Sequence, residues 1–178
     1  MPRLVLINGA PGSGKSTMAH DVAQAATMTL ALDVDALKHS LGRWEEDPLA
    51  SGLHARRLAL ALVHEQLQAG YDVVVGQYLA RPTFIEDLAS LAARHDARFI
   101  EVVLDVDVAT LADRLARRAS HPDRPEQVIN SRLVGPDDAG SLVESMEEIR
   151  QLRHEAIWVD ARGSRSSTLA RLRAALEL

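Results

Sequence analysis

The stretch "LVLINGAPGSGKSTMA", residues 4–19, contains the pattern that decides the fold. Gly9, Gly14, Lys15 and Ser16 fit G-x-x-x-x-G-K-[ST], a phosphate-binding loop that follows a strand and opens a helix. An apolar run precedes the loop and an alanine-containing helical pattern follows it, as the motif requires. Backbone N–H groups of such a loop converge on phosphate oxygens, and glycines keep that approach open. The alternative is a glycine-rich turn with a solvated lysine, but the matching context favours nucleotide binding.

The loop supplies the expected cofactor-binding residues, which are Gly12, Ser13, Gly14, Lys15, Ser16 and Thr17. Lys15 is expected to bridge the β- and γ-phosphates, and the Ser16 hydroxyl to ligate Mg²⁺. Lys15 is therefore also a candidate catalytic residue. The expected nucleotide is ATP, with GTP as an open alternative.

Short β-branched runs alternate with longer helical patterns along the chain. The expected strands cover residues 4–7, 29–32, 73–75, 99–104 and 157–159. Helical spacing is clearest at Leu60, Val63 and Leu67, at Ile85, Leu88 and Leu91, at Leu111 and Leu115, and at Leu169, Leu172 and Leu176. Strands that are apolar throughout are buried on both faces, which predicts a parallel sheet between helical layers. The expected architecture is a three-layer α/β fold in a single domain over residues 1–178.

Composition and charge argue against several classes of function. The 178 residues are 47% hydrophobic, enough to bury one core, and no window approaches the roughly 20 apolar residues of a membrane span. The net charge of −5 and the 3% aromatic content argue against nucleic acid as a partner. The chain has no cysteine, and the cytoplasm is the expected location. The expected partners are a nucleotide and a small-molecule acceptor, in a monomer or a homodimer.

The segment "LALDVDALKHSLG", residues 30–42, places two carboxylates just after the second expected strand. In open α/β sheets ligands bind at the carboxyl ends of the strands, so Asp33 and Asp35 should face the phosphate-binding loop. Asp35 is the candidate that accepts a proton from a hydroxyl or orients it toward the phosphoryl group. Asp33 is the candidate for reaching Mg²⁺ through water or for contacting the substrate. The alternative is that one of them only caps the following helix, expected over residues 36–41.

Two further side chains near this segment are candidate substrate contacts. His39 lies four residues after Asp35 on the expected helix, so both should share one side of it. Trp44 follows that helix and either lines an acceptor pocket or fills the core. The seven histidines show no zinc-binding spacing such as H-E-x-x-H.

The loop at residues 9–17, the segment Val34-Asp35-Ala36-Leu37 and the later arginine cluster together resemble the small P-loop kinases. This group includes the nucleoside monophosphate, gluconate, shikimate and adenylylsulfate kinases. The Asp35 segment is similar to the region of the proposed general base in chloramphenicol phosphotransferase. "VVVGQYLARPTFIEDLASL" (73–91) and "FIEVVLDVDVATLADRLARR" (99–118) are similar to tunicamycin-resistance proteins. The resemblance covers essentially the whole chain and implies a P-loop NTPase fold, five strands in the order 2-3-1-4-5, and a short arginine-rich lid at about 119–140.

One position departs from that resemblance. Many members of the group carry an acid after the third strand, which holds the water ligands of Mg²⁺, whereas here Gly76 and Gln77 follow the apolar run. Gln77 offers hydrogen bonds but no charge. We therefore expect Gln77 to contact the substrate, together with Arg81 four residues later.

Five arginines fall within one short interval, namely Arg114, Arg117, Arg118, Arg124 and Arg132. Arg114 and Arg118 are four residues apart and should share one helix face. The resemblance implies that Arg114 flanks the nucleotide base and that Arg117 or Arg118 covers the γ-phosphoryl group, with a lid that excludes water when it closes. The alternative is a solvated helix surface paired with Asp113.

Three classes of function remain open. The first is a kinase that phosphorylates a hydroxyl of a small molecule such as a sugar, a nucleoside or an antibiotic, with Asp35 as base or hydroxyl orienter. The second is a kinase with a phosphate acceptor, for which the acceptor-side candidates are Arg43, Arg56, Arg57 and Arg81. The third is a nucleotide-dependent binding module without efficient transfer.

Overall fold

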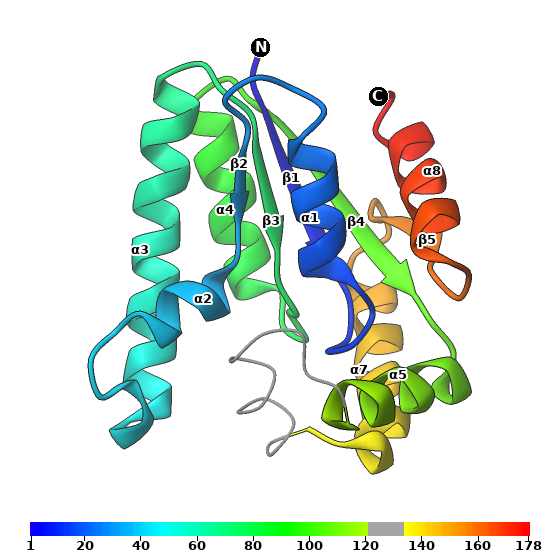
Figure 1. Ribbon diagram of the computed structural model, residues 1–178. Coiled ribbons are helices and arrows are strands. Elements are labelled where there is room, and N and C mark those ends of the chain that lie inside the picture. The colour runs from blue at the N-terminus through cyan, green and yellow to red at the C-terminus, as the bar shows by residue number, and fades with distance from the viewer. Residues whose placement is uncertain (121–133) are drawn as a thin grey trace.

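The computed structural model describes residues 1–120 and 134–178. Its centre is a five-stranded parallel sheet in the order β2-β3-β1-β4-β5, which confirms the expected fold class and strand order (Figure 1). The strands are β1 (Arg3–Asn8), β2 (Leu30–Leu32), β3 (Val73–Gly76), β4 (Arg98–Asp105) and β5 (Ile157–Asp160). Each strand boundary lies within one residue of the expected one.

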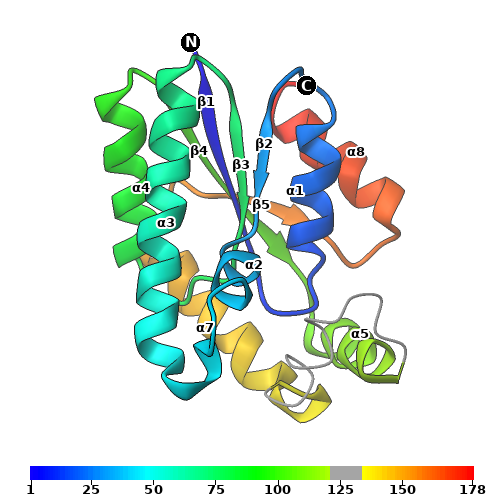
Figure 2. The same ribbon diagram turned by 60° about the vertical axis from the view of Figure 1, so that its left-hand side comes forward.

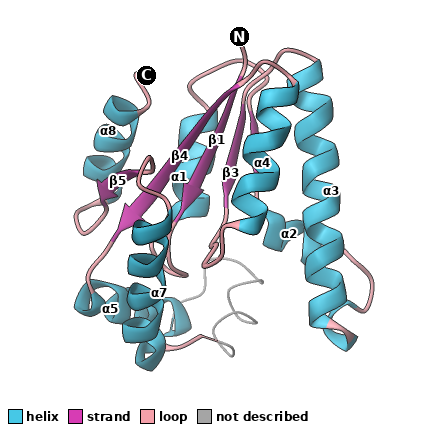
Figure 3. Ribbon diagram, turned by 180° about the vertical axis from the view of Figure 1, so that it is seen from behind, coloured by secondary structure: helices cyan, strands magenta, loops and turns pink. Residues whose placement is uncertain are grey.

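Helices cover both faces of the sheet (Figure 2). One face carries α1 (Lys15–Ala23) and α8 (Arg165–Ala175). The other face carries α3 (Pro48–Gln68), α4 (Thr83–Arg94) and α7 (Ala139–Leu152), as the view from behind shows (Figure 3). Two helices, α2 (Val34–His39) and α5 (Val108–Ser120), lie beyond the carboxyl ends of the strands. Two short 3₁₀ helices are η1 (Trp44–Glu46) and η2 (Pro136–Asp138).

The central strands of the sheet are buried because most of their side chains are apolar on both faces. Leu4, Leu6 and Ile7 of β1 are fully buried, and so are Val73 and Val75 of β3. Every β1 neighbour is parallel, so the helical connections must cross both faces of the sheet and cover them. The central strands β1, β3 and β4 therefore end together at one edge, where the phosphate-binding loop begins.

Helix starts explain two boundary differences from the sequence expectation. The carboxylate of Asp33 caps α2, so this helix begins at Val34, two residues before the expected start. Helix α7 is not among the expected helices, and its first two residues, with η2 before it, fall within the segment 119–140 that was expected to be a loop. Residues 119–120 instead end α5, and residues 136–140 form η2 and the start of α7. The predicted lid is thus helical at both ends, and its central part, with Arg124 and Arg132, lies outside the described residues.

Gly76 ends β3 at a point where the sheet touches α1. A Cβ atom at Gly76 would lie 3.1 Å from the Ala19 side chain, 3.1 Å from the Lys15 carbonyl oxygen and 3.2 Å from the Ser16 Cα atom. Any larger residue would push the first turn of α1 away from the sheet. The phosphate-binding helix is therefore seated directly on the end of β3.

Asn8, the last residue of β1, joins the phosphate-binding loop to the segment after β3. Its Oδ1 atom accepts hydrogen bonds from the Gly9 amide at 2.8 Å and the Leu79 amide at 2.9 Å, and its Nδ2 atom donates to the Leu79 carbonyl oxygen at 3.0 Å. Asn8 is fully buried, so water cannot replace it as the hydrogen-bond partner of these backbone groups. One carboxamide thus holds two loops in register.

Replacing Asn8 with alanine should lower the free energy of unfolding by about 2–4 kcal/mol. The change leaves two N–H groups and one carbonyl buried without partners, and each such group costs about 1–3 kcal/mol before the structure relaxes. Urea denaturation followed by circular dichroism measures the change. Ser120→Ala is the control, because among the described residues this exposed hydroxyl bonds only the Ala116 carbonyl oxygen, within its own helix. An Asn8→Ala protein as stable as the wild type would contradict the assigned role.

Candidate active site

The phosphate-binding loop, residues 9–14, connects β1 to α1 at the carboxyl edge of the sheet. Gly12 and Gly14 have positive φ angles of 89° and 100°, which an L side chain rarely adopts. A Cβ atom at Gly12 would also lie 3.1 Å from Leu115, so the loop runs directly against α5. Gly14 precedes α1 and no side chain caps the helix. The first amides of α1 are therefore available to an anion.

The Lys15 side chain lies within this loop, and its Nζ atom donates to the Ala10 carbonyl oxygen at 3.5 Å. Burial lowers the pKa of Lys15 from 10.5 to about 8, because removal from water penalises the charged ammonium. The negative charges of Asp35 and Asp33 oppose this shift, and the positive charge of Arg118 adds to it. The structure thus brings four predicted site residues into one electrostatic unit.

Asp33 has the structural role that the sequence left open as an alternative. Its Oδ1 atom accepts hydrogen bonds from the amides of Asp35 at 2.9 Å and Ala36 at 3.2 Å, and this caps α2. The cap uses one carboxylate oxygen, so the other can still serve a water of Mg²⁺. Asp35 is the first-turn acid of α2 and takes no part in the cap through its side chain.

Gln77 contacts Asp35 across the end of the sheet. Its Nε2 atom donates to Asp35 Oδ1 at 3.3 Å, and its backbone amide donates to the Ile7 carbonyl oxygen at 3.1 Å. Gln77 is buried, and its Oε1 atom has no hydrogen-bond partner among the described residues. An amide held in this way orients the Asp35 carboxylate without neutralising it.

Arg114 ties the phosphate-binding loop to the loop that follows β5. Its Nη1 atom donates to the Ser13 carbonyl oxygen at 3.1 Å, and its Nη2 atom donates to the carbonyl oxygens of Ala161 at 2.6 Å and Gly163 at 3.2 Å. The guanidinium edges are therefore engaged by backbone. The predicted place of Arg114 beside a nucleotide base stays a prediction.

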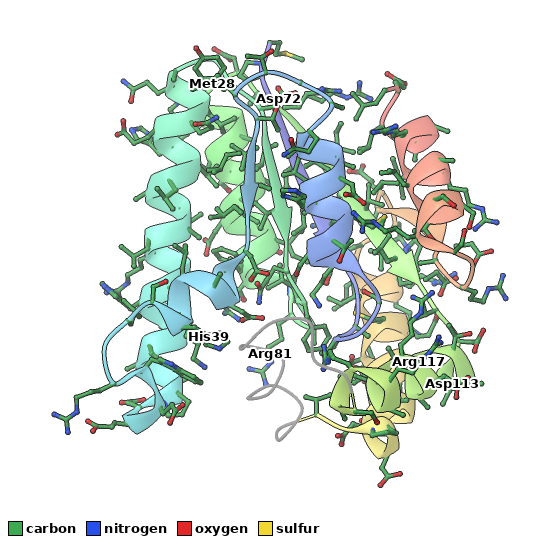
Figure 4. The ribbon with its side chains drawn as sticks, in the orientation of Figure 1. Met28, His39, Asp72, Arg81, Asp113 and Arg117 are labelled. Carbon is green, nitrogen blue, oxygen red and sulfur yellow. The ribbon has the colours of Figure 1, made fainter. Side chains whose placement is uncertain are left out.

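The two arginines that follow on α5 face different surroundings. Arg117 is exposed, lies with Asp113 on the outer side of α5, and donates Nε to the Asp113 carbonyl oxygen at 3.4 Å (Figure 4). The solvated-surface alternative thus describes Arg117. Arg118 is half-buried, and its positive charge contributes to the lowered pKa of Lys15. Burial lowers the pKa of Arg118, and its Nε and Nη2 atoms have no hydrogen-bond partner in residues 1–120 and 134–178. Of these two arginines, Arg118 is the one whose charge acts on Lys15.

A cavity of about 250 Å³ opens beside Asp35, between α2 and α3. Its lining includes the polar side chains of Asp35, Lys38, Arg56 and Gln77. The apolar part of the lining comes from Val34, Pro48, Leu49, Leu53 and Ala55, with Gly52 between them. Asp35 therefore belongs both to the charged surroundings of Lys15 and to this cavity, which we call the acceptor pocket.

Four predicted substrate contacts do not line the acceptor pocket, namely Asp33, His39, Trp44 and Arg81. His39, the last residue of α2, and Trp44 of η1 pack against each other, with ring centroids 4.6 Å apart, and neither lines the pocket. Arg81 is exposed and lies beyond the end of β3, on the same carboxyl side of the sheet as His39 (Figure 4). Met28 and Asp72 mark the opposite end of the molecule.

The residues present fit a nucleoside triphosphate with Mg²⁺. The first amides of α1 are uncapped, the Ser13 hydroxyl is buried without a partner among the described residues, and the Arg118 guanidinium is half-buried. No group of three or more His, Asp or Glu side chains within the described ranges could enclose a metal ion. Mg²⁺ in nucleotide sites keeps several waters and is held through one or two protein ligands and the phosphates. Ser16 and Asp33 remain the predicted protein ligands.

Sequence reasoning missed several residues of the site. Asn8 carried a signal, since a polar residue ends an apolar strand just before a glycine. Lys38 carried a weaker one, because it lies three residues after Asp35 and thus on the same helix face. Leu49 and Leu53 gave no signal, since only the packing of α3 against α2 brings them to the pocket.

The fold and this loop define a P-loop protein of the α/β class. The chain belongs to the AAA domain family, whose pattern its residues 4–134 match. It is also 30% identical over 128 residues to uncharacterized proteins of Mycobacterium tuberculosis and Mycobacterium bovis. That match covers 66% of this chain but only 26% of each relative, so the chain spans about a quarter of the length of the curated relatives it matches.

Solved structures of similar fold are small enzymes and a resistance protein. A gluconokinase from Sinorhizobium meliloti 1021 is 20% identical with a TM-score of 0.67, covering 99% of this chain and 92% of that one. A shikimate kinase from Bacteroides thetaiotaomicron is 21% identical with a TM-score of 0.64 and 99% coverage of both chains. The tunicamycin resistance protein of Deinococcus radiodurans is 15% identical with a TM-score of 0.66, covering 100% and 97%. At these identities the likeness establishes the shared fold.

Among the described residues, no helix combines the length and the apolar character needed to cross a bilayer. The longest helix, α3, carries charged residues along its length, including Arg56, Arg57 and Glu65.

Binding of a triphosphate near pH 8 should take up about half a proton at Lys15. The pKa of about 8 leaves this amine half-protonated in the nucleotide-free protein, and the phosphates favour the charged form. Calorimetric titration with ATP in two buffers of different ionisation enthalpy measures the uptake. Lys15→Arg stays charged at this pH and should show none. Equal uptake by both proteins would assign the proton to another group.

Proposed function

We propose that this protein is an ATP-dependent kinase that transfers the γ-phosphoryl group to a hydroxyl of a small molecule. The observation that carries the proposal is the position of Asp35, whose charge acts on Lys15 of the phosphate-binding loop and whose side chain also lines the acceptor pocket. A carboxylate between a phosphate site and a separate pocket is the arrangement that phosphoryl transfer to a bound hydroxyl requires.

The reaction follows from these positions. The acceptor oxygen forms a bond to the γ-phosphorus while the bond between that phosphorus and the bridging oxygen of ADP breaks, and Asp35 receives the hydroxyl proton. Gln77 fixes the orientation of Asp35 through its hydrogen bond at 3.3 Å. Lys15 and Arg118 stabilise the negative charge of the phosphates. Mg²⁺, bound through Ser16 with Asp33 reaching its waters, would neutralise further phosphate charge.

The acceptor pocket favours a hydroxyl over a phosphate as the acceptor. A phosphate acceptor calls for several arginines, and of the four acceptor-side candidates only Arg56 lines the pocket. Arg43 is engaged by Glu46 through an exposed ion pair. Arg57 and Arg81 are exposed and do not line the pocket. A binding module without transfer would have no use for an oriented carboxylate between two sites, so we rank it lower.

The solved structures of similar fold supply a first panel of acceptors. Gluconate and shikimate are the compounds that the names of those kinases indicate, and each carries a hydroxyl. A coupled assay of ADP release with MgATP, compared with and without each compound, tests transfer. Turnover that needs an added hydroxyl compound supports the proposal, whereas turnover indifferent to every acceptor favours a binding module.

Asp35→Asn should lower kcat by about 10²-fold or more while the affinity for ATP stays near that of the wild type. The amide cannot accept the proton, but it keeps an oxygen for the bond from Gln77 and leaves the Asp33 cap intact. Steady-state kinetics with the acceptor from the panel and an ATP binding titration measure the two quantities. A wild-type rate in Asp35→Asn would remove Asp35 from the mechanism.

Two companion variants separate the roles on the phosphate side. Lys15→Ala should abolish turnover and weaken ATP binding, because it removes the lysine charge from the loop. Asp33→Asn keeps the α2 cap, since an asparagine oxygen accepts the same bonds. Its kinetic defect should therefore shrink at high Mg²⁺ if Asp33 serves the metal, whereas the Asp35→Asn defect should not. A defect in Asp33→Asn that ignores Mg²⁺ would argue against the metal role.

A further inference from the structure

Two cationic side chains line the acceptor pocket without a carboxylate partner. Lys38 projects from α2 and Arg56 from α3, so they approach the cavity from its two walls. Among the described residues, neither forms an ion pair. Asp35 is the acid that lines the same cavity, and its negative charge acts on Lys15. The pocket therefore presents two positive charges that the protein does not neutralise there.

Aromatic rings hold both cations in place. Lys38 Nζ lies 4.9 Å from the centroid of the Trp44 ring, and the Arg56 guanidinium carbon lies 5.5 Å from the centroid of the buried Phe84 ring. An aromatic face attracts a cation but leaves its N–H groups free for an anion. Trp44, expected as a pocket or core residue, instead positions Lys38.

The rest of the pocket is apolar and open. Leu49 and Leu53 line it although they are 74% and 51% exposed, so they offer hydrophobic surface at its rim. Gly52, between them on α3, has no atom within 4 Å of the place where a Cβ would lie. A glycine inside a helix costs stability. Because no side chain of the protein packs over Gly52, the space above it is open to a ligand. A cavity of about 250 Å³ suits a compact molecule.

We propose that the acceptor is a compact hydroxy acid with an apolar flank, an inference that rests on the proposed kinase function. Its carboxylate binds Lys38 and Arg56, its apolar flank lies on Leu49 and Leu53, and its hydroxyl points to Asp35. One arginine and one lysine suit the single charge and planar shape of a carboxylate. Lys38 and Arg56 thus determine specificity for the anion, and neither takes part in the transfer itself.

A matched pair of probes tests this assignment. The probes are 3-hydroxybenzoate and its neutral counterpart 3-hydroxybenzamide, which share the ring and the hydroxyl. Binding is followed by fluorescence in a Trp158→Phe protein, in which Trp44, the neighbour of Lys38, is the only tryptophan. We expect the acid to bind at least about tenfold more tightly than the amide, as hydrogen bonds to charged groups imply. Equal affinity for the two probes would overturn the proposal.

Substitutions locate the preference within the pocket. Arg56→Gln should remove most of the tenfold preference while binding of the amide changes by less than about twofold. Arg57→Gln, the exposed neighbour outside the pocket, is the control and should keep the preference. Gly52→Leu should fill the open space and weaken both probes, whereas Ala61→Leu on the exposed side of α3 should weaken neither. A preference that survives Arg56→Gln and Lys38→Gln would place the anion elsewhere and contradict the assignment.

Transfer is measured separately from binding, so the two proposals fail differently. If the acid binds in the pocket but no hydroxy acid accepts phosphate from MgATP, the proposed function is wrong while the pocket chemistry stands. If MgATP phosphorylates neutral alcohols as well as their hydroxy acids, the function stands and the anion preference is wrong.

Discussion

The site depends on one buried carboxamide. Asn8 closes β1 and holds the Gly9 amide with one oxygen lone pair and the Leu79 backbone with its remaining groups. The first contact fixes the start of the phosphate-binding loop, and the second fixes the segment that carries Gln77. Because Gln77 in turn donates to Asp35, these hydrogen bonds and the short backbone segment from Gln77 to Leu79 connect the phosphate-binding loop to the acceptor pocket. Parallel strands bring these segments to one edge of the sheet, but Asn8 sets their distance.

How much of this was predictable from the sequence depends on the range of each interaction. The phosphate-binding loop is local, since all its residues lie within nine positions, and the strands follow from continuous apolar runs. The sequence does not decide which of Asp33 and Asp35 caps α2 and which is the catalytic candidate, because both roles favour an aspartate at the start of a helix. Arg117 and Arg118 lie on different sides of α5, and the sequence does not show which side of this helix faces the phosphate-binding loop. The aromatic partner of Arg56 comes from the distant helix α4, and that of Lys38 lies beyond the end of α2, where helical spacing no longer applies, so no spacing rule indicates either contact.

The electrostatics of the site make its ligand-free form costly. Arg118 is half-buried beside Lys15, and the two like charges repel. Burial penalises both, which is why the pKa of each is lowered. Positive groups held in this way need little rearrangement when phosphate arrives, and preorganisation of this kind is the main electrostatic contribution to transfer. The burial of these charges costs stability at this edge of the sheet. The Asn8 contacts and the buried strands offset that cost and hold the edge together.

The low pKa of Lys15 also gives the protein a distinct chemical reactivity. The 178 residues contain two lysines, Lys15 in the phosphate-binding loop and Lys38 in the acceptor pocket. With a pKa of about 8, roughly one Lys15 amine in ten is uncharged and nucleophilic at pH 7, against well below one in a thousand for an ordinary lysine. An electrophile that acylates amines therefore meets its most reactive lysine inside the phosphate loop. Labels that react with amines consequently mark the phosphate-binding loop and the acceptor pocket as well as the exposed amino group of Met1, and bound phosphate, by restoring the charge, would shield Lys15.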